Sequence, residues 1–298
     1  MRLATVRTDD GTTRLYGGGS DGFFDLVEAA ESRSMGGLAR VTDVGSFLRA
    51  GPAADADARE LMRDAGHWPA TPLEGLRLAP PVTLPRSIVC VGRNYLEHVR
   101  EGNSPVPEFP ILFSKFPNTL VGHDEPVVRH AITSELDYEG ELALIIGRQA
   151  RRVLKDEALA FVAGYTVLND ISARDLQLGD VQWIRGKSLD TFCPLGPVFV
   201  SADEVEDPGR LQIETRVNGE LRQNAPCSDM IFDIPTLLAF ISEAITLEPG
   251  DLVATGTPSG TAFGMDPRRY LEPGDSVEVR ITDLGTLRSP IVGPEDGR

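Results

Sequence analysis

Two glutamates, Glu139 and Glu141, lie beside an apolar run at residues 142–147, and no basic residue stands among them. The Leu- and Ile-rich run predicts a buried strand that ends at Gly147. Alternate side chains of a strand share a face, so the two carboxylates should lie close together. Because ionised carboxylates in a partly desolvated place repel each other, one must bind a proton or a cation must lie between them. A cation held only by oxygen ligands would be Mg²⁺, Mn²⁺ or Ca²⁺. The alternative to a metal site is an exposed strand edge whose acids lie in water.

Asp170 is the third candidate ligand. Residues 164–170 predict another buried strand, and this strand ends on the acid. A carboxylate at the end of a buried strand is well placed to complete an oxygen cage with two others. We therefore expect Glu139, Glu141 and Asp170 to form one metal site.

His98 and Glu101 form a second chemical pair. They belong to a short predicted helix at residues 96–101, which Gly102 closes. Residues three apart share a helix face, where a carboxylate can orient an imidazole and stabilise its charge. Such a pair can act as a general base, and an ordinary surface His–Glu pair is the alternative.

Three basic residues fall near these groups. Lys115 is embedded in an apolar strand at residues 111–116, so it either snorkels to the rim or faces a pocket. For Arg174 the simplest interpretation is a surface salt bridge to Asp175, and for Lys187 a solvated charge.

The elements that position these groups divide the chain in two. Residues 1–75 predict a small unit with a hairpin, at residues 3–7 and 12–16, followed by helices at residues 24–30, 44–48 and 53–65. A proline-rich stretch at residues 78–85 predicts an extended linker. Beyond it, strands predominate, and helices are predicted at residues 157–163 and 233–245.

The segment Gly18-Gly19-Ser20-Asp21-Gly22 fits the pattern of a hydrolase nucleophile elbow. We reject that interpretation because only a short hairpin precedes the segment and the second half of the chain has no histidine. A glycine-rich turn explains it. The chain also lacks a Walker loop, a dinucleotide fingerprint and internal repeats.

The composition is that of an ordinary globular protein of 298 residues, with 41% hydrophobic and 25% charged residues. The formal net charge of -16 argues against nucleic acid or an anionic membrane as a partner. The N-terminal segment has no signal-peptide pattern and no run is long enough to span a bilayer, so we expect a cytoplasmic protein. Three well-separated cysteines indicate buried thiols.

Sequence blocks that occur in order over residues 86–292 resemble the fumarylacetoacetate hydrolase superfamily. The resemblance is greatest to its branch of fumarylacetoacetate-hydrolase-domain-containing, acylpyruvase-like proteins. The blocks that carry the resemblance are Cys90-Val91-Gly92-Arg93-Asn94-Tyr95, Asp137-Tyr138-Glu139-Gly140-Glu141-Leu142-Ala143, Asn169-Asp170-Ile171-Ser172-Ala173-Arg174-Asp175, Gly186-Lys187-Ser188 and Thr255-Gly256-Thr257-Pro258. The resemblance implies an α+β, mostly β fold, with a catalytic domain of rolled mixed sheets at residues 81–298. It also implies a homodimer and one bound Mg²⁺ or Mn²⁺, with Ca²⁺ possible in vitro. The small N-terminal α/β domain with its linker, at residues 1–80, is expected from the sequence pattern; residues 1–75 carry none of the blocks, which leaves their role open.

The resemblance also implies roles for single residues. Glu139, Glu141 and Asp170 would be the metal ligands, and His98 with Glu101 the water-activating dyad. Lys187 would be catalytic beside the oxo-acid head of the substrate. The implied substrate contacts are Arg93, Lys115, Arg174, Gln182 and Thr257.

Three functions are compatible with these groups. The first is a metal-dependent hydrolase that cleaves a C–C bond in acylpyruvates or related 2,4-diketo acids. The second is an oxaloacetate-type decarboxylase or a 2-hydroxyhepta-2,4-diene-1,7-dioate-type isomerase on the same site. The third is a protein that holds a 2-oxo acid through the cation without cleaving it. Residues 261–263 depart from the family pattern beside the expected carboxylate site, which leaves the accepted acyl group open.

Overall fold

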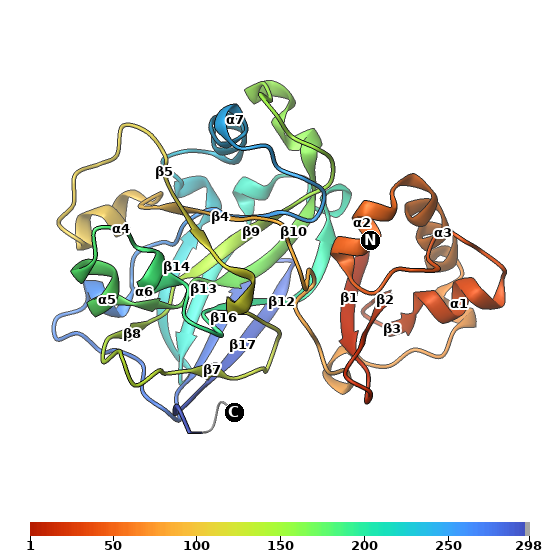
Figure 1. Cartoon of the computed structure of the whole chain (residues 1–298), viewed down its shortest axis with the longest axis horizontal. Coiled ribbons are helices and arrows are strands. Elements are labelled where there is room, and N and C mark those ends of the chain that lie inside the picture. The colour runs from red at the N-terminus through yellow and green to blue at the C-terminus, as the bar shows by residue number, and fades with distance from the viewer. Residues whose placement is uncertain (296–298) are drawn as a thin grey trace.

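The computed structural model describes residues 1–295. The first part of the chain forms a three-stranded antiparallel sheet with helices on its outer side (Figure 1). The strands are β1 (Arg2–Arg7), β2 (Thr13–Gly19) and β3 (Gly22–Asp25), and the helices are α1 (Leu26–Ser32), α2 (Val44–Ala50) and α3 (Pro52–Arg63), followed by short 3₁₀ turns at Ala65–His67 and Leu73–Gly75. The expected hairpin is therefore present. Helix α1 begins two residues later than expected because Phe24 belongs to β3, opposite Gly17.

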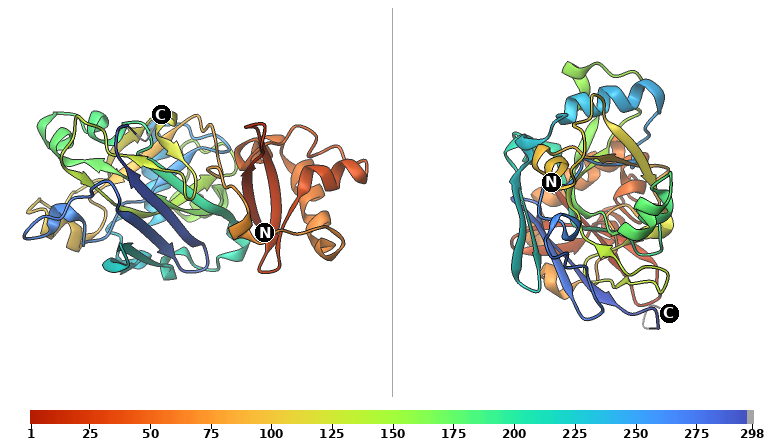
Figure 2. Two further views of the ribbon diagram at one scale, coloured as in Figure 1. Left: turned by 90° about the horizontal axis from the view of Figure 1, so that it is seen from below. Right: turned by 90° about the vertical axis from the view of Figure 1, so that its left-hand side faces the viewer.

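These strands continue into the main sheet of the protein. Its order is β3-β2-β1-β12-β10-β9-β15-β4-β5, with β6 on a side branch of β12. The added strands are β4 (Ile88–Gly92), β5 (Ile111–Lys115), β6 (Leu120–Val121), β9 (Gly140–Ile146), β10 (Val162–Asn169), β12 (Cys193–Ser201) and β15 (Leu252–Ala254). The left-hand view of Figure 2 shows strands β1–β3 between the larger body and helices α1–α3.

A second, five-stranded sheet packs against the main one in order β14-β13-β16-β17-β7. Its strands are β7 (Val127–Val128), β13 (Gln212–Val217), β14 (Glu220–Pro226), β16 (Ser276–Ile281) and β17 (Gly285–Val292). A two-stranded ladder joins β8 (Leu136–Asp137) to β11 (Ser172–Ala173). The helices of this part are α4 (Leu96–Glu101), α5 (Arg174–Gly179), α6 (Ile184–Lys187) and α7 (Ile234–Ala244), with 3₁₀ helices at Pro117–Thr119, Lys155–Phe161, Ala202–Glu204, Pro208–Arg210, Cys227–Asp229 and Ala262–Gly264.

Strand β9 separates two hydrophobic cores. Leu142, Leu144 and Ile146 join the core that includes the second sheet, whereas Ala143 and Ile145 join the core that includes helices α1–α3. The alternation follows from the two-residue period of a strand. Both faces of β9 are thus buried, which explains its nearly continuous apolar sequence. The mixed sheets and short helices confirm an α+β fold that is mostly β.

No helix of the described residues combines the length and the apolar character needed to cross a membrane. The segment expected to be helical at residues 157–163 is instead a 3₁₀ helix at Lys155–Phe161, and β10 begins directly after it. Helix α7 agrees with the expectation, and Asp233 caps its N-terminus by accepting a hydrogen bond from Thr236 N. The rejected nucleophile elbow is the turn between β2 and β3.

Candidate active site and metal centre

Glu139, Glu141 and Asp170 gather where β9 begins and β10 ends. The two strands are antiparallel with Gly140 opposite Asn169, so the residues beside this pair are neighbours. The backbone N–H of Asp170 donates to the carbonyl of Glu139 at 2.8 Å, which ties the two ends together. One carboxylate oxygen from each residue lies within 4.8 Å of the others, and all three residues are buried.

Three buried cations surround two of these carboxylates. Lys187 Nζ donates to Glu139 Oε2 at 2.7 Å and to Asp170 Oδ2 at 2.8 Å. Lys115 Nζ donates to Asp170 Oδ1 at 2.5 Å, and Arg174 Nη2 lies 2.6 Å from Glu139 Oε1. Burial lowers the pKa of Lys187, but Asp170 and Glu139 outweigh burial and raise it, so Lys187 remains charged. Glu139 is also buried, and Arg174 and Lys187 still hold its pKa well below the usual range.

Glu141 is the least compensated carboxylate of the three. It accepts a hydrogen bond from Gly256 N at 2.8 Å, and the residues of the described chain offer it no cation as a salt-bridge partner. Burial, Asp170 and Glu139 raise its pKa well above the ordinary value of 4.5. A divalent ion among the three carboxylates would remove this repulsion. The donor set of carboxylate oxygens therefore fits a hard ion such as Mg²⁺ or Mn²⁺.

The His98–Glu101 pair faces the same site from α4. His98 Nδ1 lies 2.8 Å from Glu101 Oε1, which orients the ring and leaves Nε2 available to a ligand. Glu101 is held in turn by Gly260 N at 2.9 Å and by the Thr261 hydroxyl at 3.1 Å. A Cβ on Gly264 would come within 2.5 Å of the Glu101 carboxylate, so a residue without a side chain is needed there. The dyad is thus fixed by the loop at residues 260–264.

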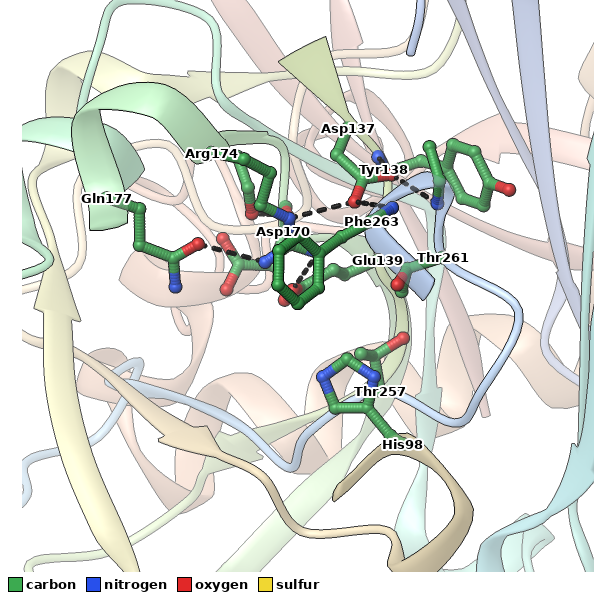
Figure 3. Close-up of polar contacts among 12 residues, drawn as sticks. His98, Asp137, Tyr138, Glu139, Asp170, Arg174, Gln177, Thr257, Thr261 and Phe263 are labelled. Carbon is green, nitrogen blue, oxygen red and sulfur yellow. Dashed lines mark hydrogen bonds and ion pairs between the residues drawn. The ribbon is translucent and has the colours of Figure 1, made fainter. Parts of the chain in front are cut away.

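Asp137 is a part of the site that sequence reasoning missed. Its fully buried carboxylate accepts hydrogen bonds from Arg174 Nε at 2.8 Å, Ala262 N at 2.8 Å and Phe263 N at 3.1 Å (Figure 3). It therefore links the arginine beside Glu139 to the loop that fixes Glu101. The available signal was its place two residues before Glu139 in an apolar context, where a second buried acid needs partners.

One cavity of about 220 Å³ brings most of the predicted residues together. Seven of them line it: Arg93, His98, Glu139, Glu141, Arg174, Lys187 and Thr257. Glu101 and Asp170 contact lining residues from outside. Thr257 donates its hydroxyl to the carbonyl of Gly140 at 3.0 Å and accepts from Gln223 at 2.8 Å, so it is firmly held.

Two of the residues proposed as substrate contacts lie elsewhere. Lys115 does not line the cavity, because its ammonium group is bound to Asp170 and to the carbonyl of Ile171. Gln182 is exposed and outside the lining, whereas Gln177 lines the cavity and accepts from Arg174 Nη1 at 2.9 Å.

The salt bridge considered between Arg174 and Asp175 is also not formed among the described residues. Arg174 pairs with Asp137 and Glu139 instead. Asp175 accepts hydrogen bonds from the Thr133 hydroxyl and from Ser134 N.

A mostly β fold that carries three buried carboxylates, fixed cations and a His–Glu dyad on one cavity defines an enzyme site. The chain belongs to the fumarylacetoacetate hydrolase family, whose model, described as fumarylacetoacetate (FAA) hydrolase, C-terminal, matches residues 87–292. This match confirms the family resemblance of the sequence.

Three relatives illustrate the range of names in the family. The oxaloacetate tautomerase YisK of Bacillus subtilis is 48% identical over 74% of this chain and 74% of its own. The mitochondrial oxaloacetate tautomerase FAHD2A of Homo sapiens is 42% identical over 83% of this chain and 78% of its own. The solved fumarylacetoacetate hydrolase of the psychrophile Exiguobacterium antarcticum is 37% identical, with a TM-score of 0.83 over 98% of this chain and 99% of its own.

Proposed function

We propose that this protein is a divalent-metal-dependent tautomerase that interconverts the keto and enol forms of oxaloacetate or a similar small 2-oxo acid. The observation that carries the proposal is the joint lining of one small cavity by an oriented imidazole, His98, and by the charged groups Arg174 and Lys187 beside the carboxylate triad. Proton transfer at C3 of a 2-oxo acid requires a base near C3 and positive charge beside the oxygen of the enolate that forms. The names of the two relatives at 48% and 42% identity support the same reaction.

The residues of the chain divide the work as follows. His98, oriented by Glu101, takes a proton from C3 of the keto form through Nε2. Lys187 and Arg174 place positive charge beside the developing enolate, and the protonated Lys187 can donate to its oxygen. A cation bound to Glu139, Glu141 and Asp170 would supply Lewis-acid stabilisation of the same negative charge. After the enol leaves, His98 loses its proton to water and Lys187 takes one up, which restores the enzyme; the reverse transfers convert enol to keto.

The size of the cavity supports a small substrate. Pockets for drug-sized ligands occupy about 300–1,000 Å³, and this cavity is about 220 Å³. The ring of Phe263 lines it, with the guanidinium of Arg174 at 5.6 Å from the ring centroid. A four-carbon acid is therefore favoured over an acylpyruvate with a long acyl chain.

Hydrolysis of acylpyruvates is the second candidate, and the fixed His98–Glu101 dyad favours it. The same imidazole could deprotonate a water that attacks the distal carbonyl of a 2,4-diketo acid, releasing pyruvate and a carboxylic acid. The name of the Exiguobacterium antarcticum relative is consistent with this chemistry. Assembly as a homodimer and a cytoplasmic location stay predictions.

One assay separates these functions. Metal-stripped protein is given oxaloacetate or acetylpyruvate with and without Mn²⁺, while enol absorbance, deuterium uptake at C3 and pyruvate are followed together. A tautomerase accelerates enol decay and C3 exchange of oxaloacetate only with the cation, and releases no more pyruvate than Mn²⁺ does without protein. Pyruvate from acetylpyruvate would favour the hydrolase, and pyruvate from oxaloacetate the decarboxylase. No acceleration of any process would leave a binding protein.

A further inference from the structure

Arg93 adopts a backbone conformation that is unfavourable for a residue with a side chain. It follows β4 with a φ of 57°, in the left-handed region. The next residue holds it there: the buried Asn94 side chain donates to the carbonyl of Thr255 at 2.8 Å and accepts from Phe232 N at 2.8 Å. The backbone carbonyl of Asn94 also accepts from Ile231 N at 2.7 Å. Strain maintained by such a fixed turn is typical of functional positions.

The guanidinium of Arg93 lies over the indole ring of Trp183. Its central carbon is 5.6 Å from the ring centroid, and the Trp183 and Phe113 rings meet edge-on with their centroids 5.5 Å apart. A Cβ on Gly92 would come within 2.5 Å of the Trp183 ring, so this ring packs directly onto the end of β4. A guanidinium over an aromatic ring can still donate its N–H groups to a planar, bidentate partner such as a carboxylate.

Arg93 differs from the other cations that line the cavity. Arg174 and Lys187 are both engaged with carboxylates of the site. Within residues 1–295, Arg93 makes neither a side-chain hydrogen bond nor an ion pair, although the chain carries a net charge of -16. Its positive charge is therefore left for a ligand.

The charge of the site leads to the same conclusion. Its inner cluster contains four carboxylates and three cations, and so carries one net negative charge when all are ionised: Asp137, Glu139, Glu141 and Asp170 against Lys115, Arg174 and Lys187. A divalent ion at the triad would reverse the sign of this net charge, and Arg93 adds a further positive charge. The groups that line the cavity therefore favour an anionic ligand.

We propose that Arg93, supported by Trp183, binds the second carboxylate of the substrate and makes the site selective for 2-oxo dicarboxylic acids over 2-oxo monocarboxylic acids. This inference rests on the proposed tautomerase function. The oxo-acid head occupies the end of the cavity at Arg174 and Lys187, and the distal carboxylate meets Arg93.

The test compares two substrates that differ in the distal carboxylate. Deuterium exchange at C3 is measured for oxaloacetate and for 2-oxobutanoate with Mg²⁺, in the wild type and in Arg93→Met. Charged hydrogen bonds contribute about 1.5–3 kcal/mol, so kcat/KM for oxaloacetate should fall roughly 10- to 100-fold, while that for 2-oxobutanoate stays within about twofold. Arg93→Lys should be intermediate for oxaloacetate. Arg100→Met, at an exposed arginine of α4, is the matched control and should leave both substrates unaffected.

A binding measurement keeps the inference testable if the tautomerase proposal fails. The chain has two tryptophans, so in a Trp68→Phe background the fluorescence reports on Trp183 beside Arg93. Oxaloacetate should bind more tightly than 2-oxobutanoate, and Arg93→Met should remove that difference even if no substrate turns over. Equal binding of the two acids by the wild type, or equal losses for both in Arg93→Met, would overturn the proposal. Absence of C3 exchange alone would overturn only the tautomerase.

Discussion

Replacing Glu141 by glutamine should stabilise the metal-free protein at neutral pH. Glu141 is 1% exposed, and burial together with Asp170 and Glu139 raises its pKa well above 4.5. The folded protein therefore retains a proton on this group at pH values where the unfolded chain has released it. Because the folded state then binds more protons, this contribution makes metal-free stability fall as pH rises above 4.5.

The size of the effect has an upper bound. If Glu141 stays protonated in the folded state, folding at pH 7 must add a proton to a carboxyl whose pKa in the unfolded chain is 4.5. At about 2.5 pH units above that pKa, the proton costs about 3.4 kcal/mol of folding free energy, which is the upper bound. Glutamine has nearly the same shape, carries no charge and can still accept from Gly256 N. For a chain of this size, a gain of about 3 kcal/mol corresponds to a rise of roughly 6–12 °C in melting temperature at most.

Calorimetry of EDTA-treated protein at pH 5 and pH 7, with and without Mn²⁺, tests the prediction. Glu141→Gln should melt above the wild type at pH 7 without metal, and the difference should shrink at pH 5. Mn²⁺ at about 100 times its Kd should stabilise the wild type by about 2.7 kcal/mol and the variant far less. The control Glu243→Gln changes an exposed glutamate and should follow the wild type throughout. This prediction is wrong if the metal-free variant melts below the wild type at pH 7, or if it gains as much stability from Mn²⁺ as the wild type does.

Three further variants test the dyad, the buried linking acid and a helix cap. His98→Ala should lower C3 exchange about 10²- to 10⁴-fold while the Mn²⁺-induced rise in melting temperature is retained; unchanged turnover would remove the dyad from the mechanism. In Asp137→Asn, the donors of Arg174 and of two loop amides lose their carboxylate acceptor. We expect the free energy of unfolding to fall by about 2–4 kcal/mol and kcat to fall as well. Wild-type values of both quantities would contradict the assigned role. Asp43→Ala removes the cap of α2 and the acceptor for Thr83, at a cost of about 1–2 kcal/mol at pH 7. Burial raises the pKa of Asp43, but the hydrogen bonds from Thr83 outweigh burial and lower the pKa below 3.8. The stabilisation is therefore complete above pH 3.8 and is lost as the pH falls below that value. The melting temperatures of the wild type and Asp43→Ala should converge as the pH falls below 3.8.

The sequence anticipated those parts of the site that depend on regular strand geometry. Glu139 and Glu141 follow the two-residue period, and Asp170 follows the end of a buried strand, so their meeting required only that β9 and β10 pair. The hairpin of β1 and β2 was equally local, because Asp10-Gly11 provides the turn. Helix α7 was signalled by its own cap and apolar period.

The sequence could not show contacts that depend on long-range packing. Adjacent residues of a helix do not face each other, so the proximity of Arg174 to Asp175 in sequence was misleading, and the true partner, Asp137, lies on another strand. Gln177 lines the cavity from α5, whereas Gln182 lies beyond the end of α5 at Gly179 and is exposed. Lys115 lies in a strand as expected, but which side of Asp170 it approaches depends on the packing of β5 against the main sheet.

The pairing of β1 with β12 has a consequence for any shortened form of the protein. The two strands are in register at Arg2 with Val200 and at Leu3 with Phe199, and all nine residues of β12 are buried. Removing the first 80 residues would uncover both the hydrogen-bonding edge of β12 and the apolar surface around Phe199. An uncovered strand edge beside an exposed apolar surface can pair with other chains in intermolecular sheets. The N-terminal strands therefore protect the rest of the chain from aggregation. A fragment that lacks them should precipitate before its activity can be measured.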